Sequence, residues 1–79
     1  MANVIMYTST TCKFCDKLKD FLEQNSIPYE ERNVKLNPQY AQELVQKSGG
    51  YGVPVSDIGG TIIIGYNLPK IKSALGLSY

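Results

Sequence analysis

Two cysteines, Cys12 and Cys15, are the residues of this 79-residue chain whose type and spacing predict chemistry. They are the only cysteines in the sequence, and only Lys13 and Phe14 separate them. Residues three positions apart lie on the same face of a helix, so two sulfur atoms there can close a small disulfide ring. A Cys-x-x-Cys pair that follows a strand and opens a helix indicates a thiol–disulfide redox site.

A strand and a helix are predicted on either side of this pair. The apolar residues 4–7 predict a buried strand, and Thr10 and Thr11 are candidate N-caps for a helix over about residues 13–25. A helix start offers unpaired N–H groups and the positive end of the helix dipole, which both favour a thiolate. The expected helix therefore places its first cysteine where ionisation is easiest.

We expect Cys12 to be the nucleophile and Cys15 to be the second, more buried thiol that resolves the mixed disulfide. The setting of Cys12 predicts a pKa of about 4–7, against about 8.5 for a free cysteine. Lys13 either steadies the thiolate or is an ordinary solvated lysine. Phe14 is either a substrate-facing ring or, as its spacing from Leu18 favours, the first core residue of the helix.

The rest of the chain predicts three more strands and two more helices. Residues 29–34 predict a strand, and residues 55–58 and 61–64 predict a hairpin around Gly59-Gly60. A second helix is predicted after Asn37, its N-cap, with Pro38 at its first position; it turns Ala41, Leu44 and Val45 inward and ends at Gly49-Gly50. A third helix is predicted after its cap Asn67, with Leu68, Ile71 and Leu75 facing inward. The order β-α-β-α-β-β-α predicts an α/β fold, a four-stranded mixed sheet with helices on both faces.

Composition excludes several classes of function. A length of 79 residues predicts one domain, residues 1–79, and the net charge of +1 argues against nucleic acid or an anionic membrane as partner. No apolar run is long enough to span a bilayer, and no secretion signal is visible, so we expect a cytoplasmic protein. We also expect it to be a monomer. The absence of histidine excludes Ser-His and Cys-His catalysis and His-containing metal sites.

Three short motifs together resemble the glutaredoxin-like branch of the thioredoxin superfamily, over residues 4–77. They are Tyr7-Thr8 followed by Cys12-Lys13-Phe14-Cys15, then Gly52-Val53-Pro54-Val55, then Ile58-Gly59-Gly60 through Ile64-Gly65-Tyr66-Asn67. The resemblance implies a thioredoxin-like fold and a dithiol oxidoreductase.

The same resemblance implies roles for residues outside the cysteine pair. It implies a cis peptide bond before Pro54, which would face the cysteines and free the backbone of Val53 to pair with an extended thiol substrate. It implies that Gly65, Tyr66 and Asn67 bind the γ-glutamyl carboxylate of glutathione, and N–H groups at a helix start do form anion sites. With Lys13 and Phe14, these residues make up the predicted binding set.

The chain departs from the family pattern at three places. Lys13-Phe14 replaces the usual Pro-Tyr, Ser9 stands where many members have lysine, and Asn67 stands where an acidic residue is common. These departures concern the predicted contacts with glutathione and leave the two thiols unchanged.

The predicted function is reduction of disulfide-containing proteins or glutathione mixed disulfides, without a bound cofactor and with glutathione as co-substrate. Such a protein serves electron transport and cell redox homeostasis. One alternative is an electron donor to ribonucleotide reductase that is itself reduced by a thioredoxin reductase-type flavoprotein. Another is a non-enzymatic carrier of metal or a [2Fe–2S] cluster, because two thiolates are half of such a site. No metal site is predicted within a single chain.

Overall fold

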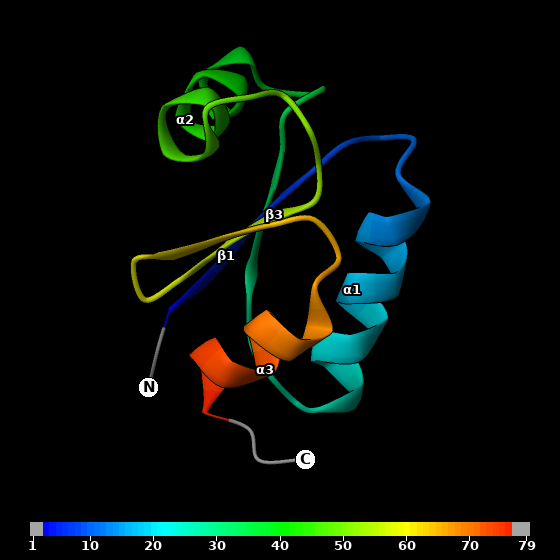
Figure 1. The fold of residues 1–79 in the computed structure, drawn as a ribbon. Coiled ribbons are helices and arrows are strands. Elements are labelled where there is room, and N and C mark those ends of the chain that lie inside the picture. Colours follow the sequence, from blue (N-terminus) through cyan, green and yellow to red (C-terminus); the bar gives the residue numbers. More distant parts are fainter. Residues whose placement is uncertain (1–2, 77–79) are drawn as a thin grey trace.

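The computed structural model describes residues 3–76, which form four strands and three helices in the predicted order (Figure 1). The strands are β1 (Val4–Thr8), β2 (Glu30–Asn33), β3 (Val55–Ile58) and β4 (Thr61–Ile64). The helices are α1 (Lys13–Gln24), α2 (Pro38–Ser48) and α3 (Leu68–Leu75). The predicted mixed sheet is confirmed, and none of the helices described is long and apolar enough to cross a membrane.

The four strands form one sheet in the order β2-β1-β3-β4. β1 pairs in parallel with β2, to which α1 connects it, and antiparallel with β3. The predicted hairpin of β3 and β4 has the predicted bounds. Tyr7 pairs with Val55, and Val55 pairs with Ile64, so the end of β1, the start of β3 and the end of β4 lie side by side.

This register brings the predicted site residues to one end of the sheet. The chain leaves β1 toward Cys12, enters β3 directly after Pro54, and leaves β4 at Gly65. Three segments that are far apart in the sequence therefore meet at one end of the sheet.

Helices cover both faces of the sheet, α1 and α3 on one side and α2 on the other (Figure 1). Side chains of β1 alternate between the two layers: Met6 packs with Leu18 and Ile71 under α1 and α3, whereas Tyr7 packs with Leu44 of α2. Both layers pack against the same central strands, so a small chain can bury the apolar sides of the helices on both faces of the sheet.

The inner face of α1 differs from the predicted one. Its buried residues are Cys15, Leu18 and Leu22, at spacings of three and four, whereas Phe14 is 56% exposed. The prediction that Phe14 is a core residue is wrong, because Cys15 takes the inward position at the start of the stripe. Cysteine is among the residue types most often buried, so the redox spacing and the core spacing coincide here.

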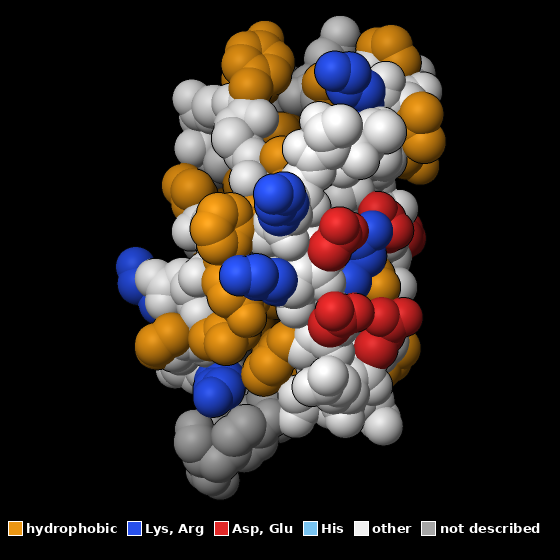
Figure 2. Space-filling model, turned by 90° about the vertical axis from the view of Figure 1, so that its right-hand side faces the viewer, with side chains coloured by type: hydrophobic (Ala, Val, Ile, Leu, Met, Phe, Trp, Pro, Cys, Tyr) orange, Lys and Arg blue, Asp and Glu red, His pale blue; other side chains and the backbone are white. Residues whose placement is uncertain are grey.

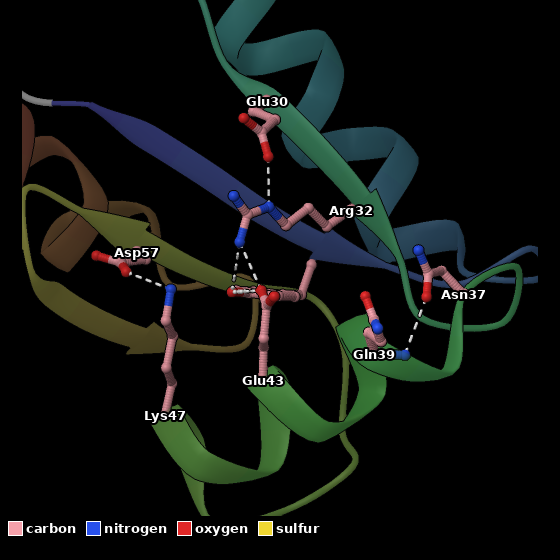
Figure 3. A network of polar contacts seen from close by, with 8 residues as sticks. Glu30, Arg32, Asn37, Gln39, Glu43, Lys47 and Asp57 are labelled. Carbon is pink, nitrogen blue, oxygen red and sulfur yellow. Dashed lines mark hydrogen bonds and ion pairs between the residues drawn. The ribbon is translucent and has the colours of Figure 1, made fainter.

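Ion pairs fasten α2 to the sheet (Figure 3). Arg32 of β2 lies between Glu30 and Glu43, and Lys47 of α2 reaches Asp57 of β3 at 2.8 Å. The buried Tyr7 hydroxyl donates to Glu43 at 2.9 Å, and this bond, with help from Arg32, lowers the pKa of the Glu43 carboxyl. These polar contacts add to the packing of Leu44, the buried apolar residue of α2.

Candidate active site

Cys12 is the N-cap residue of α1. Its backbone is extended, with φ −139° and ψ 103°, and its Sγ accepts a hydrogen bond from the backbone N–H of Cys15 at 3.1 Å. The predicted caps, Thr10 and Thr11, are wrong, because the helix begins at Lys13 and the sulfur occupies the place of a capping oxygen. The first helical turn thus directs an N–H group at the sulfur that is predicted to react.

The two cysteines form a disulfide, with 5.2 Å between their Cα atoms. Cys12 is half-buried, whereas Cys15 is 1% exposed and belongs to the core that α1 and α3 share. This difference agrees with the predicted order of reactivity, in which only the first sulfur meets a substrate directly.

The peptide bond between Val53 and Pro54 is cis, as the resemblance implied. Pro54 is buried and its carbonyl accepts a hydrogen bond from the N–H of Gly65 at 2.8 Å, which joins the segment before β3 to the segment after β4. Gly65 has φ +84°, a left-handed conformation that side chains other than glycine rarely adopt.

A shallow pocket of about 260 Å³ lies at this junction. Its lining residues come from all three site segments: Phe14, Val53, Pro54, Gly65 and Tyr66. The ring centroids of Phe14 and Tyr66 are 6.0 Å apart, within the range of attractive aromatic pairs. The structure therefore brings together five of the seven residues in the predicted binding set.

The other two members of that set, Lys13 and Asn67, flank the pocket in the sequence without lining it. Lys13 is exposed at the first position of α1. Asn67 is the predicted N-cap of α3, and its side chain accepts from the N–H of Lys70 at 3.4 Å. Pro69 has no N–H, so the anion site expected at this helix start has few free donors.

Sequence reasoning missed Lys17. Its ammonium lies 5.3 Å from the centroid of the Phe14 ring, so it stands beside the pocket's aromatic pair. Its spacing of four from Lys13 was the available signal, because residues i and i+4 share a helix face. Within residues 3–76 no group of three or more Cys, Asp or Glu side chains is placed to hold a metal ion.

Comparisons with known proteins agree with this geometry. A family model described as glutaredoxin matches residues 4–63. A glutaredoxin-like 8.6 kDa protein from the rubredoxin operon of Clostridium pasteurianum is 35% identical over 70 residues, which cover 89% of this chain and 93% of that protein. Glutaredoxin 3 of Escherichia coli K12 is 33% identical over 54 residues, 68% of this chain and 65% of that protein.

Solved structures show the same fold. The glutaredoxin of Archaeoglobus fulgidus superposes with a TM-score of 0.83 at 29% identity, over 95% of this chain and 87% of that one. A mutant of the thioredoxin-like protein BC3987 superposes with a TM-score of 0.91 at 27% identity, over 99% of this chain and 100% of that one.

Proposed function

Because the chain belongs to the glutaredoxin family, we propose that it is a thiol–disulfide oxidoreductase that reduces disulfides through Cys12 and Cys15. The observation that carries this proposal is the placement of the Cys12 sulfur. The sulfur lies at the start of α1 and accepts the N–H of Cys15 at 3.1 Å, and Cys12 is the more exposed of the two cysteines. A hydrogen bond to the charged form and the helix dipole both lower the pKa of a thiol.

The reaction proceeds in two exchanges, starting from the reduced protein. The thiolate of Cys12 attacks one sulfur of the substrate disulfide, the substrate S–S bond breaks, and one substrate thiolate leaves. The thiolate of Cys15 then attacks the Cys12 sulfur, the intermolecular bond breaks, and the second substrate thiolate leaves. Two electrons pass from the protein to the substrate, and the Cys12–Cys15 disulfide of the structure is the product.

The residues around the pocket hold the substrate during these exchanges. The backbone of Val53, next to the cis bond, pairs with the extended chain beside the substrate sulfur, and Pro54 lines the pocket. Gly65 and Tyr66 line the other side, and Asn67 follows them at the start of α3, where the carboxylate of glutathione would approach when glutathione is the co-substrate. Lys13 adds positive charge next to the reacting sulfur.

The electron donor is glutathione or a thioredoxin reductase-type flavoprotein, and the acceptor is a disulfide-containing protein. In this proposal the protein acts as a cytoplasmic monomer without a bound cofactor. Its site is complete within one chain, since all three segments come from the same sheet end.

One assay run with two reducing systems tests the proposal. Reduction of a protein disulfide is followed first with glutathione, glutathione reductase and NADPH, then with thioredoxin reductase and NADPH. We expect sustained NADPH oxidation with at least one system and none above background when Cys12→Ser replaces the native protein. Failure of the native protein with both systems, and with chemically reduced protein in a single turnover, would overturn the proposal.

A further inference from the structure

We propose that the surface beside Cys12 binds an acidic polypeptide segment that carries an apolar side chain next to the disulfide to be reduced. This inference rests on the proposed function and names its substrate class. The surface, called the aromatic–lysine surface below, consists of Phe14, Tyr66, Lys13, Lys17 and Lys70.

The two rings supply the apolar part of this surface. Phe14 is 56% exposed and Tyr66 is 37% exposed, and both line the shallow pocket next to the cis bond. Large apolar side chains that remain exposed side by side are typical of binding sites. A pocket of about 260 Å³ between them has room for one apolar side chain of a partner.

The three lysines supply the positive charge of this surface. Lys13, Lys17 and Lys70 form no ion pair within residues 3–76. Lys17 lies over the Phe14 ring, Lys13 directly follows Cys12 as the first residue of α1, and Lys70 lies in the first turn of α3. The three segments that meet at the site, residues 9–15, 49–56 and 64–70, contain two lysines and no acidic residue.

All acidic residues lie outside the three site segments, but Asp16 directly follows Cys15 in the first turn of α1, where its carboxylate lies 3.8 Å from the Lys19 ammonium. Three lysines against this one acidic residue still leave a local positive excess at the site. Five of the seven carboxylates pair with Lys19, Arg32 or Lys47: those of Asp16, Glu30, Glu31, Glu43 and Asp57. On the face that Figure 2 shows, the acidic side chains gather in one area with a basic side chain among them, and other basic side chains lie beside hydrophobic ones in the neighbouring area. A partner with the opposite charge is attracted to this basic area.

A polypeptide fits this surface better than glutathione does. Glutathione has no apolar side chain for the pocket between Phe14 and Tyr66. Its carboxylate would also meet a weak anion site, because Pro69 lacks an N–H and the N–H of Lys70 already bonds to Asn67. Acidic side chains of a peptide can instead reach the flexible ammonium groups of Lys17 and Lys70.

Matched peptide disulfides test the inference. Each peptide carries one leucine next to an intramolecular disulfide. The two residues that flank this leucine–disulfide segment are both Glu, both Gln or both Lys. The second-order rate constant for reduction by the dithiol protein is measured in single turnover at low and high ionic strength. We expect the Glu peptide to react about tenfold faster than the Lys peptide at low salt, with the Gln peptide between them. The difference should shrink at about 0.5 M salt, because salt screens exposed charges.

Charge-reversal variants locate the effect. Lys17→Glu and Lys70→Glu should lower the preference for the Glu peptide several-fold. The control Lys35→Glu makes the same change of charge after β2, at the sheet edge opposite to β4 and Tyr66, and should leave the preference unchanged.

The outcomes separate the two proposals. Equal rates for the three peptides, an equal effect of Lys35→Glu, or faster reduction of glutathione disulfide than of the Glu peptide would overturn the inference while leaving the oxidoreductase intact. If none of the disulfides were reduced, the proposed function would fail and the inference with it.

Discussion

The Cys12 sulfur has a structural role as well as a chemical one. It is the N-cap acceptor of α1, a place usually taken by an oxygen of Ser, Thr, Asp or Asn. The hydrogen bond from the Cys15 N–H therefore both caps the helix and depends on the charge of the Cys12 sulfur. A thiolate accepts this bond more strongly than a thiol, because charge-assisted hydrogen bonds are the stronger ones.

Substituting each cysteine in turn should separate structure from chemistry. Cys12→Ser should fold with a free energy of unfolding equal to or above that of the reduced native protein, because serine is a preferred N-cap. It should not react with disulfides. Cys15→Ser should attack them and accumulate the mixed disulfide. Urea denaturation and intact-mass spectrometry measure both properties. A mixed disulfide that formed through Cys15 in the Cys12→Ser protein would contradict these roles.

Phe14 offers a second test at the residue scale, because its sequence spacing and its structure disagree. Phe14→Ala should change the free energy of unfolding by no more than about 0.5 kcal/mol, as for most surface positions, and should raise KM for a peptide disulfide. Leu22→Ala, in the buried stripe, should cost about 2–5 kcal/mol. A loss above 2 kcal/mol for Phe14→Ala would place the ring in the core.

At the scale of elements, α2 is the helix that depends most on polar contacts. Leu44 is its one fully buried residue among those described, and the ion pairs of Arg32 and Lys47 connect it to β2 and β3. Burial raises the pKa of Asp57, but hydrogen bonds from the Lys47 ammonium and the Gly60 N–H together hold it below its ordinary value of 3.8. The folded state therefore stabilises the ionised carboxyl.

This lowered pKa predicts a pH-dependent stability. The contribution of Asp57 is complete above its ordinary pKa of 3.8, the value for the unfolded chain, and is lost as pH falls through its lower folded pKa. Asp57→Asn should lower the free energy of unfolding at pH 7 by about 1.5–3 kcal/mol, the usual value for a charged hydrogen bond. The gap between variant and native protein should close as denaturation is repeated at pH values below 3.8. A gap that stays constant with pH would exclude the ion pair as its cause.

The apolar attachment of α2 predicts a contrast between two leucines. Leu44→Ala should cost about 2–5 kcal/mol of unfolding free energy, because it empties a fully buried position under α2. Leu36, just before the helix, is 78% exposed, and Leu36→Ala should change stability by no more than about 0.5 kcal/mol. Urea titrations of both variants measure the difference, and equal losses would show that α2 is not fastened through Leu44.

Element order and hairpin bounds could be predicted because they depend on local signals. The Gly59-Gly60 turn, the Asn37 and Asn67 caps and the end of α2 at Gly49 all act within a few residues. The exposure of Phe14 could not be predicted. The spacing of apolar residues identifies the inward side of a helix, but it does not show which edge of that side the neighbouring helix covers. Contacts between distant elements, such as the hydrogen bond from Tyr7 to Glu43, could not be predicted from local sequence patterns either.

At the scale of the whole molecule, the register of three strands builds the site. Tyr7, Val55 and Ile64 lie in one row, so the cysteine pair, the cis bond and Gly65 are neighbours although about 50 residues separate the first from the last. The cysteine pair and the cis proline could be identified from sequence motifs. The grouping of Lys17 with Phe14, and the pairing of most acids away from the site, required the three-dimensional structure.

The pH dependence of alkylation of the reduced protein tests the central claim most directly. Reaction with iodoacetamide is followed at each cysteine by peptide mass spectrometry between about pH 4 and pH 10. Cys12 should react first, with an apparent pKa well below the value of about 8.5 for a free thiol, and Cys15 should react slowly at neutral pH. Faster modification of Cys15, or an apparent pKa of 8.5 or above for Cys12, would contradict the assignment of Cys12 as the nucleophilic thiolate.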